Sequence, residues 1–332
     1  MKTISRVPSR LGLGGGGTDI PNYFNLHGGA VLNCTINHFV YCIVSDNEDM
    51  YICESLDKNK FENSETSNKK LILHWSTIHY FQKNFYLNIN KIRMITFTDI
   101  PEGSGLGTSS ALVVAMVKAV SEHFNLSFDK AKLVAVAYEI ERIMCKLNGG
   151  FQDYISAVFG GINFIEFFAN TEYLVTPLKI SQSNKCQLEN QAVLVFTGLS
   201  RDSAKIITEQ EQSINEINKL ENMHQIKNAA IKLKHALITS DFKEFRKVFQ
   251  ESWEAKKATS TSVSNHITTD IEEGLMSNGA EAIKISGAGG GGFIIALTSS
   301  EKILNLRNYI RSNYEYKNFS IVEMGAYAWK EE

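Results

Sequence analysis

Residues 101–111 form the glycine-rich segment Pro-Glu-Gly-Ser-Gly-Leu-Gly-Thr-Ser-Ser-Ala, which constrains the fold more than any other part of the chain. Its three alternating glycines lack Cβ atoms, so the backbone can turn tightly and bring its N–H groups against an anion. Hydroxyl side chains follow at 108–110, and the helix predicted over 111–124 directs the positive end of its dipole at the same point. The segment therefore predicts a polyphosphate-binding loop. It lacks the lysine of a G-x-x-x-x-G-K-S/T loop, so it is not a P-loop.

Two further glycine runs, at 12–17 and 287–292, formally match the G-x-G-x-x-G pattern of dinucleotide-binding folds. That fold requires a helix after the glycines and an acidic residue about 20 positions later. The first run is followed by Thr-Asp-Ile-Pro and has Leu32 at the later position, while the second leads into the apolar strand segment 293–297. Neither context fits a dinucleotide fold. Because each glycine adds entropy to the unfolded chain, runs of four favour backbone that approaches a ligand over turns that merely pack closely.

Composition limits the kinds of partner that the protein can have. With 332 residues, 43% of them hydrophobic, the chain is long enough for two domains. The formal net charge of −2, without a basic block, argues against nucleic acid as a partner. Five scattered cysteines predict reduced thiols, and the N-terminus lacks the apolar run of a signal peptide. The apolar run 113–120 is far shorter than the roughly 18 residues that a membrane span needs. We therefore expect a cytoplasmic protein with no membrane segment.

Hydrophobic periodicity and turn residues predict a mixture of helices and strands. Strands are predicted over 38–44, 92–98, 159–168, 192–197, 282–285, 293–297 and 319–324. Helices are predicted over 111–124, 127–146 with Ser127 as N-cap, 203–220, 222–239, 241–258 and 301–312. The polar segment 56–70 is predicted to be a loop. A second polar segment, 169–190, marks the best domain boundary, so the chain is divided into domains 1–180 and 181–332.

The three glycine motifs, in this order, resemble those of the GHMP kinase superfamily, which includes galactokinases and mevalonate kinases. Residues 8–19 are similar to the family's first motif, residues 101–111 to its second and residues 284–293 to its third. The resemblance spans nearly the whole chain. Within the family, the four-glycine form that ends in Thr18-Asp19 most resembles the D-glycero-D-manno-heptose 7-phosphate kinases. Fucokinase-like relatives are the nearest competitors.

The resemblance implies an α+β fold of two lobes, with mixed β-sheets packed with helices and with nucleotide and sugar in the cleft between the lobes. It implies ATP and Mg²⁺ as cofactors, and a sugar or sugar phosphate as partner of a monomer or homodimer. The implied reaction transfers the γ-phosphate of ATP to the anomeric hydroxyl of a heptose 7-phosphate. The product would be a heptose 1,7-bisphosphate for nucleotide-sugar and surface-glycan synthesis. A kinase of another sugar, such as L-fucose or galactose, and a non-catalytic sugar sensor remain alternatives.

Phosphoryl transfer needs a phosphate cradle, a metal, a base and positive charge, and the resemblance implies residues for each. Asp153 is the implied general base, and Arg10 its cationic partner. Ser110 and Glu141 are the implied Mg²⁺ ligands, with Glu139 as the alternative carboxylate. Taken alone, these side chains could equally be a helix N-cap, a surface ion pair and a solvated carboxylate. The implied nucleotide-binding residues are Pro101, Gly103, Ser104, Gly105, Leu106, Gly107, Thr108, Ser109 and Ser110.

A phosphorylated acceptor would also need cationic side chains in its pocket. The candidates are Arg201, which follows a predicted strand, and the Lys256-Lys257 pair, with Arg6 a weaker one. The lysine pair could equally form an exposed helical face. Asp19 could accept hydrogen bonds from two sugar hydroxyls, or cap a helix. The expected acceptor-binding residues are Gly16, Gly17, Thr18, Asp19, Arg201, Lys257, Gly289, Gly290 and Gly291.

Overall fold

Two β-sheets, each covered by helices, form the two lobes of the protein. The computed structural model describes residues 1–332 except 48–49, 86–90, 102, 200–205, 210–215 and 332. Within the described residues, the larger sheet has the order β12-β1-β2-β5-β3-β4, while β6 pairs with β2 and β7 pairs with β6. Its strands are β1 (Lys2–Gly14), β2 (Gly29–Asp46), β3 (Ile52–Ser55), β4 (Lys60–Asn63), β5 (Ile92–Thr98), β6 (Ile162–Phe167), β7 (Tyr173–Pro177) and β12 (Tyr327–Glu331). The smaller sheet has the order β11-β8-β10-β9, with strands β8 (Ala192–Phe196), β9 (Ala282–Ile285), β10 (Phe293–Leu297) and β11 (Tyr316–Lys317).

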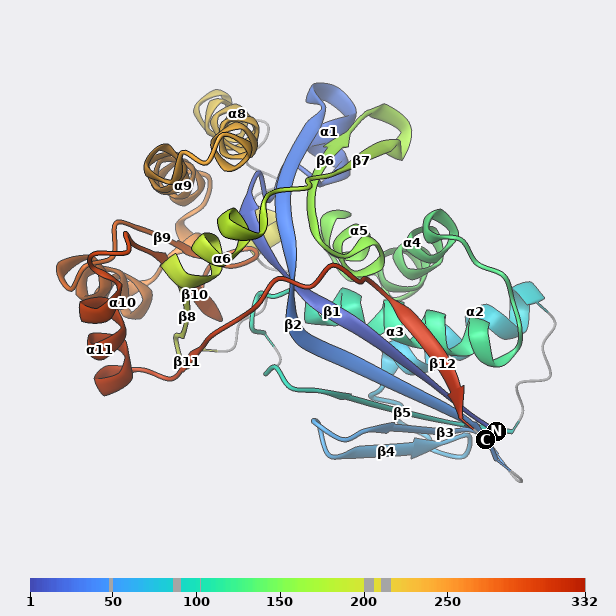
Figure 1. The fold of residues 1–332 in the computed structure, drawn as a ribbon. Helices are drawn as coiled ribbons and strands as arrows, with labels where there is room; N and C mark the ends of the chain where they lie inside the picture. The colour runs from blue at the N-terminus through green and yellow to red at the C-terminus, as the bar shows by residue number, and fades with distance from the viewer. Residues whose placement is uncertain (48–49, 86–90, 102, 200–205, 210–215, 332) are drawn as a thin grey trace.

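Helices cover one face of the larger sheet (Figure 1). They are α2 (Ile72–Phe85), α3 (Thr108–His123), α4 (Lys130–Tyr138) and α5 (Gln152–Phe159). The central helix, α3, is buried on nearly every side, as its run of apolar residues predicts. The remaining helices are α1 (Pro21–His27), α6 (Gln182–Gln191), α8 (Ile217–Ile238), α9 (Phe242–Lys257), α10 (His266–Ser277) and α11 (Ile303–Asn313). The α+β fold with mixed sheets, predicted from the resemblance, is confirmed.

A shared apolar core joins the two lobes. Leu11 and Leu13 on β1 belong to the same buried cluster as Leu233 of α8, Phe249 of α9 and Phe293 of β10. β1 therefore faces the C-terminal lobe along the half that carries the first glycine run. The C-terminal strand β12 pairs antiparallel with the start of β1, so the last residues of the chain return to the larger sheet. The division at residue 180 stays a prediction.

Several predicted elements are confirmed and others need correction. The strands at 92–98, 282–285 and 293–297 have the predicted bounds. The predicted helix 127–146 is interrupted, because α4 ends at Tyr138 and a π-helix (Glu139–Met144) follows, and Asp129 rather than Ser127 caps it.

Tertiary pairing accounts for the other differences. The predicted strand 319–324 is wrong: within it only Ile321 forms a single bridge, with Ile36. The polar segments 56–70 and 169–190 contain β4, and β7 with α6. Part of the predicted helix 203–220 falls outside the described residues. Of these elements, the short strands β4 and β7 depend on pairing with β3 and β6 rather than on their own periodicity.

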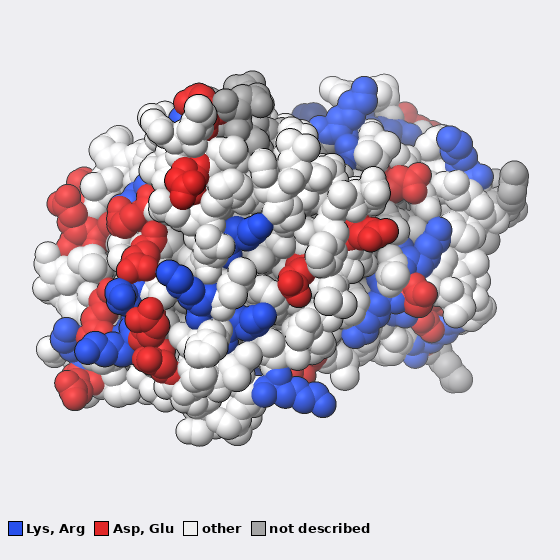
Figure 2. Space-filling model, turned by 90° about the horizontal axis from the view of Figure 1, so that it is seen from above, with Lys and Arg blue, Asp and Glu red and all other residues white. Residues whose placement is uncertain are grey.

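Charges of both signs are mixed on one face of the molecule (Figure 2). On the face seen from above, acidic and basic side chains are interspersed, with no large area of one sign (Figure 2). Among the described residues, no helix is both long and apolar enough to cross a membrane.

Candidate active site

The three glycine runs meet at the N-terminal end of α3. Gly107 has a left-handed φ of 73° and is the N-cap residue of this helix, a conformation that is strained for residues with a Cβ atom. The loop between β9 and β10 packs on the glycine-rich segment that precedes α3. The Phe293 N–H donates to the Ser104 carbonyl oxygen at 2.9 Å, and a Cβ at Gly292 would overlap that oxygen. The predicted polyphosphate loop thus lies between the two lobes.

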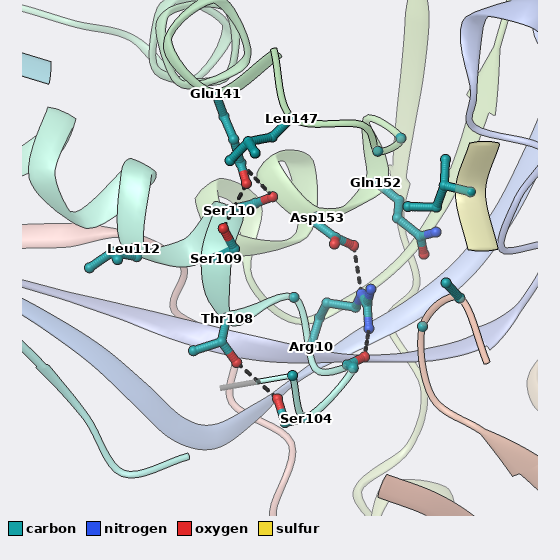
Figure 3. A pocket seen from close by; sticks show the side chains of 18 of the residues that line it. Arg10, Ser104, Thr108, Ser109, Ser110, Leu112, Glu141, Leu147, Gln152 and Asp153 are labelled. Atoms are coloured by element: carbon teal, nitrogen blue, oxygen red, sulfur yellow. Dashed lines mark hydrogen bonds and ion pairs between the residues drawn. The ribbon is translucent and has the colours of Figure 1, made fainter. Parts of the chain in front are cut away.

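A cleft of about 360 Å³ opens at this junction (Figure 3). Most of the residues predicted for the site line it, although they come from distant parts of the chain. They are Arg10, Gly16, Gly17, Asp19, Gly103, Ser104, Gly105, Gly107, Thr108, Ser109, Ser110, Glu141 and Asp153. The expected place of the site, in a cleft that all three glycine runs border, agrees with this geometry.

Arg201 falls outside the described residues. Some of the other predicted residues do not line the cleft. Thr18 is buried beneath the first glycine run, where its hydroxyl donates to the carbonyl oxygens of Gly15 (2.8 Å) and Ala30 (3.0 Å). Leu106 is fully buried, and Pro101 is not among the lining residues. Arg6 lies between the rings of Phe39 and Tyr327, also outside the lining.

Three glycines of the third run pack closely against protein atoms. A Cβ at Gly289, Gly290 or Gly291 would meet protein atoms of Val263, Ile206 or Leu199. These three glycines are not among the residues that line the cleft, whereas Gly287 and Ala288 are. The run therefore brings the β9–β10 loop close to its protein neighbours.

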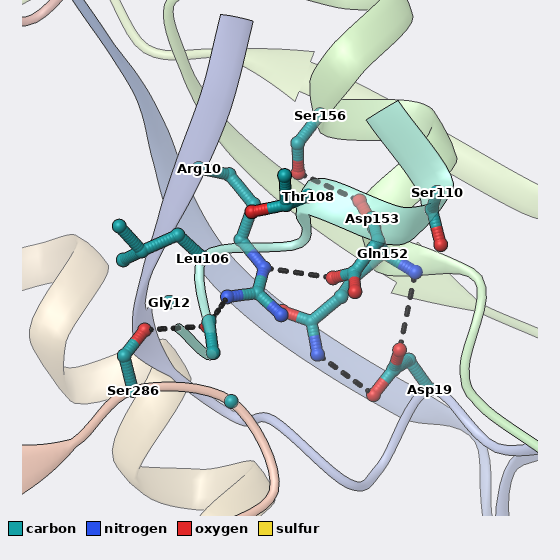
Figure 4. A network of polar contacts seen from close by, with 12 residues as sticks. Arg10, Gly12, Asp19, Leu106, Thr108, Ser110, Gln152, Asp153, Ser156 and Ser286 are labelled. Atoms are coloured by element: carbon teal, nitrogen blue, oxygen red, sulfur yellow. Dashed lines mark hydrogen bonds and ion pairs between the residues drawn. The ribbon is translucent and has the colours of Figure 1, made fainter. Parts of the chain in front are cut away.

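Arg10 and Asp153 form an ion pair at the wall of the cleft. Arg10 Nε lies 2.7 Å from Asp153 Oδ1, and the arginine side chain is 6% exposed against 20% for the aspartate. Arg10 Nη1 also donates to the Gly105 carbonyl oxygen at 2.5 Å (Figure 4). Asp153 belongs to the first turn of α5, which starts after a short glycine-containing turn. A carboxylate oriented by a guanidinium therefore stands beside the phosphate loop, within reach of a molecule in the cleft.

Glu141 occupies the other end of the loop, buried at 2% exposure. It accepts hydrogen bonds from Ser109 Oγ (2.7 Å), Ser110 Oγ (2.9 Å) and the Tyr154 hydroxyl (2.7 Å). Arg142 Nη1 lies 3.4 Å from it. Glu141 projects from the π-helix that follows α4, a distortion that often marks functional sites.

The residues around Glu141 suit a magnesium ion. Mg²⁺ binds through one or two carboxylates and a few other oxygens while it keeps several waters. Ser110 and Glu141 supply a hydroxyl and a carboxylate that touch each other and both line the cleft. Glu139 is exposed and faces Tyr80 instead. Among the described residues, no group of three or more His, Cys, Asp or Glu side chains could hold a metal, so any Mg²⁺ here would need oxygens from the nucleotide and water.

Asp19, beside the first glycine run, lines the cleft and is buried. Oδ1 accepts from the Gly17 N–H and from Gln152 Nε2, both at 3.0 Å, and Oδ2 accepts from the Gln152 N–H at 3.1 Å. Burial, together with the charge of Asp153, raises the pKa of Asp19 above its ordinary 3.8. Gln152 therefore orients a carboxylate whose charge is disfavoured by its surroundings.

We expect the KM for the acceptor to rise as the pH falls. This rise should begin at a higher pH than it would if Asp19 had the pKa of an ordinary aspartate. Protonation of Asp19 removes the charge that would accept sugar hydroxyls, and its raised pKa moves this loss toward neutral pH. The Asp19→Asn variant should have an acceptor KM about 10- to 100-fold higher, because a hydrogen bond to a charged group is worth about 1.5–3 kcal/mol. Steady-state kinetics against pH measure both effects.

In the Asp19→Asn variant, the acceptor KM should no longer depend on pH in this range, and the KM for ATP should be unchanged. An acidic rise in the acceptor KM that persists in this variant would assign the titration to another group.

Because its folded-state pKa is raised, Asp19 stabilises the fold only while protonated. Relative to Asp19→Asn, the wild-type protein should therefore lose stability as the pH rises through that pKa.

Of the two adjacent lysines, the structure brings Lys256 to the cleft and not Lys257. Lys256 is 3% exposed, and its ammonium group donates to the carbonyl oxygens of Gly287 (2.7 Å) and Gly16 (3.4 Å). It lines the cleft. Lys257 pairs instead with Glu254 at 3.0 Å and Glu272 at 3.4 Å. Neighbouring positions on a helix point about 100° apart, so only one of the pair can face the site.

The sequence reasoning missed several residues that complete the site. Gln152 and Tyr154, on either side of Asp153, bind Asp19 and Glu141, and their place next to the predicted base was an available signal. Arg142 follows the predicted metal ligand and pairs with it. Lys284 and Ser286, at the start of the third motif, gave no signal, because their contacts depend on how the two lobes pack.

A glycine-rich loop at a helix N-terminus, an arginine–aspartate pair and a group of oxygen side chains around Glu141 border one cleft between the two lobes, an arrangement that suits a phosphotransferase. Family models agree with this class: the GHMP kinases N terminal domain matches residues 72–161, and the GHMP kinases C terminal domain matches residues 233–315. The chain belongs to the GHMP kinases.

Comparison with individual proteins shows which members of the family this chain resembles. The chain is 38% identical to a D-glycero-alpha-D-manno-heptose 7-phosphate kinase of Campylobacter jejuni subsp. jejuni, covering 99% of this chain and 100% of that protein. The crystal structure of a D-glycero-D-manno-heptose 1-phosphate kinase from Bacteroides thetaiotaomicron is similar with a TM-score of 0.84 and 31% identity, covering 99% of each chain. A galactokinase of Thermotoga neapolitana is 24% identical over 93% of each chain.

Proposed function

We propose that the protein is an ATP-dependent kinase that transfers the γ-phosphate to the anomeric hydroxyl of a heptose 7-phosphate. The observation that carries the proposal is the Arg10–Asp153 pair, which borders the phosphate loop in the cleft. Similarity over the full chain to a heptose 7-phosphate kinase supports the choice of acceptor. Galactose and L-fucose are weaker candidates, because the relatives that act on them are less similar.

The residues divide the work of phosphoryl transfer among them. The acceptor hydroxyl oxygen forms a bond to the γ-phosphorus, the bond from that phosphorus to the β-phosphate oxygen breaks, and Asp153 receives the hydroxyl proton. Arg10 offsets charge on the transferring group, and the loop N–H groups with the α3 dipole bind the phosphates. Ser110 and Glu141 would hold Mg²⁺, which neutralises charge on the β- and γ-phosphates when bound.

The acceptor would be oriented by Asp19, Gln152 and the backbone of Gly16 and Gly17. Lys256, rather than Lys257, is the cation that we propose for the acceptor phosphate, together with Arg201. The presence of the base, its arginine, the serine and the glutamate argues against a non-catalytic sensor. Since ATP and sugar phosphates are metabolites of the cytoplasm, we propose that the reaction occurs there.

A panel of acceptors tests the proposal directly. The protein is incubated with Mg²⁺-ATP and either heptose 7-phosphate, heptose 1-phosphate, mannose 6-phosphate, L-fucose, galactose or mevalonate, and ADP release is followed. We expect turnover with heptose 7-phosphate, and ³¹P NMR of the product should contain a new anomeric phosphate. Turnover confined to heptose 1-phosphate would move the reaction to another hydroxyl. Activity with an unphosphorylated sugar alone would reject a phosphorylated acceptor, and no activity with any compound would favour the sensor.

The adjacent lysines provide a matched pair of variants. Lys256→Met should raise the KM for the phosphorylated acceptor about 10- to 100-fold, the effect of losing one charge-assisted hydrogen bond, and should leave the KM for ATP nearly unchanged. Lys257→Met should change neither, since its ammonium group pairs with Glu254 and Glu272. The opposite pattern would return the role to Lys257, and equal effects on ATP and acceptor would remove Lys256 from the acceptor pocket.

A further inference from the structure

Two hydrogen bonds converge on the Gly105 carbonyl oxygen. Ser286, just after β9, donates its hydroxyl to this oxygen at 2.8 Å, and Arg10 Nη1 donates to it at 2.5 Å (Figure 4). The carbonyl therefore links the third glycine motif to the arginine that binds Asp153. Ser286 itself is fully buried and is not among the residues that line the cleft.

Lys284, two residues earlier on β9, makes a second link to the same region. It is 3% exposed, and its ammonium group donates to the Gly12 carbonyl oxygen on β1 at 3.1 Å. Burial, with Lys256 and Arg10 nearby, lowers the pKa of Lys284 well below its ordinary value. A buried ammonium group costs free energy that an apolar side chain would avoid. This cost indicates that the role of Lys284 is its hydrogen bond to Gly12 rather than apolar packing.

The stretch of β1 that Lys284 contacts has less support from its own sheet than the rest of the strand. The register with β2 shifts between Pro8 and Ser9, and again between Gly12 and Gly14. Arg10 lies between these two irregularities. Irregularities of this kind re-aim side chains near active sites, and they weaken the local ladder. Additional contacts are therefore needed to fix the direction in which the guanidinium of Arg10 points.

We propose that Lys284 and Ser286 are positioning residues for phosphoryl transfer, which hold Arg10 against Asp153 through the carbonyl groups of Gly12 and Gly105. Both come from the C-terminal lobe, whereas Arg10 and Asp153 belong to the N-terminal one. The contact between lobes thus sets the geometry of the catalytic pair. The expected effect on rate rests on the proposed function, but the effect on Arg10 geometry does not.

Substitution of either residue should lower kcat more than it changes KM. Lys284→Met should reduce kcat about 10- to 30-fold and Ser286→Ala about 3-fold, because small misplacements of catalytic groups reduce rates strongly. The KM values for ATP and acceptor should change less than about 2-fold, since neither side chain binds substrate. Lys227→Met is the matched control, because Lys227 of α8 also donates to a backbone carbonyl, that of His27, at 2.7 Å but is not among the residues that line the cleft. It should leave kcat unchanged.

A double-mutant cycle separates positioning from a general structural effect. If Lys284 acts through Arg10, the Arg10→Ala, Lys284→Met double variant should be no slower than Arg10→Ala alone. Rate losses that multiply in the double variant would overturn the proposal. The Ser286→Ala variant, which removes only a hydroxyl, keeps the test available if Lys284→Met folds poorly.

The side-chain Nε–H signal of Arg10 gives a readout that needs no turnover. It can be assigned in arginine-labelled protein by comparison with Arg10→Lys, and we expect it to shift and exchange faster with water in Lys284→Met and Ser286→Ala. If the wild-type protein phosphorylates none of the acceptors but this signal still moves, the proposed function fails and the positioning inference stands. A signal identical to that of the wild-type protein in both variants would overturn the inference, whatever the activity.

Discussion

Replacement of Asp153 by asparagine is expected to lower kcat about 1,000-fold or more while ATP still binds. General bases contribute roughly 10²- to 10⁴-fold to rates, and an amide cannot take the proton of the acceptor hydroxyl. Asparagine has the same shape, and its oxygen can still accept the 2.7 Å hydrogen bond from Arg10 Nε. The phosphate loop should therefore keep its form. Steady-state kinetics and a calorimetric titration with a non-hydrolysable ATP analogue measure the two effects.

The Asp129→Asn variant is a suitable control for this change. Asp129 also starts a helix, where its carboxylate accepts from the Lys132 N–H at 2.7 Å, and asparagine caps helices about as well as aspartate. This variant should turn over like the wild-type protein. Turnover in Asp153→Asn within about 10-fold of the wild-type rate would be inconsistent with general-base catalysis, whose loss costs more. A loss of ATP binding would instead indicate that Asp153 supports the loop.

Much of the site follows from local sequence, because glycine-rich turns and helix starts are specified by a few neighbouring residues. The loop at 101–111 and the strand that leads into it can be predicted in this way, although α3 begins at Thr108, three residues before the predicted start. Asp153 and Arg10 needed the family resemblance, since 143 positions separate them in the chain. Their ion pair exists only because α5 packs against β1.

Other parts depend on tertiary packing and could not be predicted from local patterns. Which of Lys256 and Lys257 faces the cleft depends on the rotation of α9 about its axis, which is set by its buried face. Lys284 starts the third motif, but no local pattern shows that its side chain is buried and reaches the Gly12 carbonyl oxygen on β1. The residues of the π-helix that carries Glu141 continue the hydrophobic pattern of an ordinary α-helix. The larger number of residues in its turn therefore cannot be recognised from the sequence periodicity.

Glu141→Gln is expected to lower kcat about 100- to 1,000-fold and to raise the Mg²⁺ concentration needed for half-maximal activity. Metal coordination stabilises the transition state by several kcal/mol, and about 1.4 kcal/mol corresponds to a factor of ten. The amide oxygen of glutamine can accept from the hydroxyls on one side, and its NH₂ group can donate to the oxygens on the other, so most of the local structure should persist. The buried Arg142 loses the partner that raises its pKa against the effect of burial. Titration of activity with Mg²⁺ at saturating ATP is the measurement.

Two further comparisons distinguish a metal ligand from a structural anchor. Glu139→Gln, two positions earlier on the exposed side of the same π-helix, should leave both kcat and the Mg²⁺ dependence unchanged. In Glu141→Gln, the unpaired Arg142 should lower the free energy of unfolding by about 1–3 kcal/mol. If stability falls by that amount while the Mg²⁺ dependence stays that of the wild-type protein, Glu141 holds Arg142 and the two serines but not the metal. If the Mg²⁺ dependence shifts instead, and excess Mg²⁺ restores part of the activity, Glu141 is identified as a ligand of the metal.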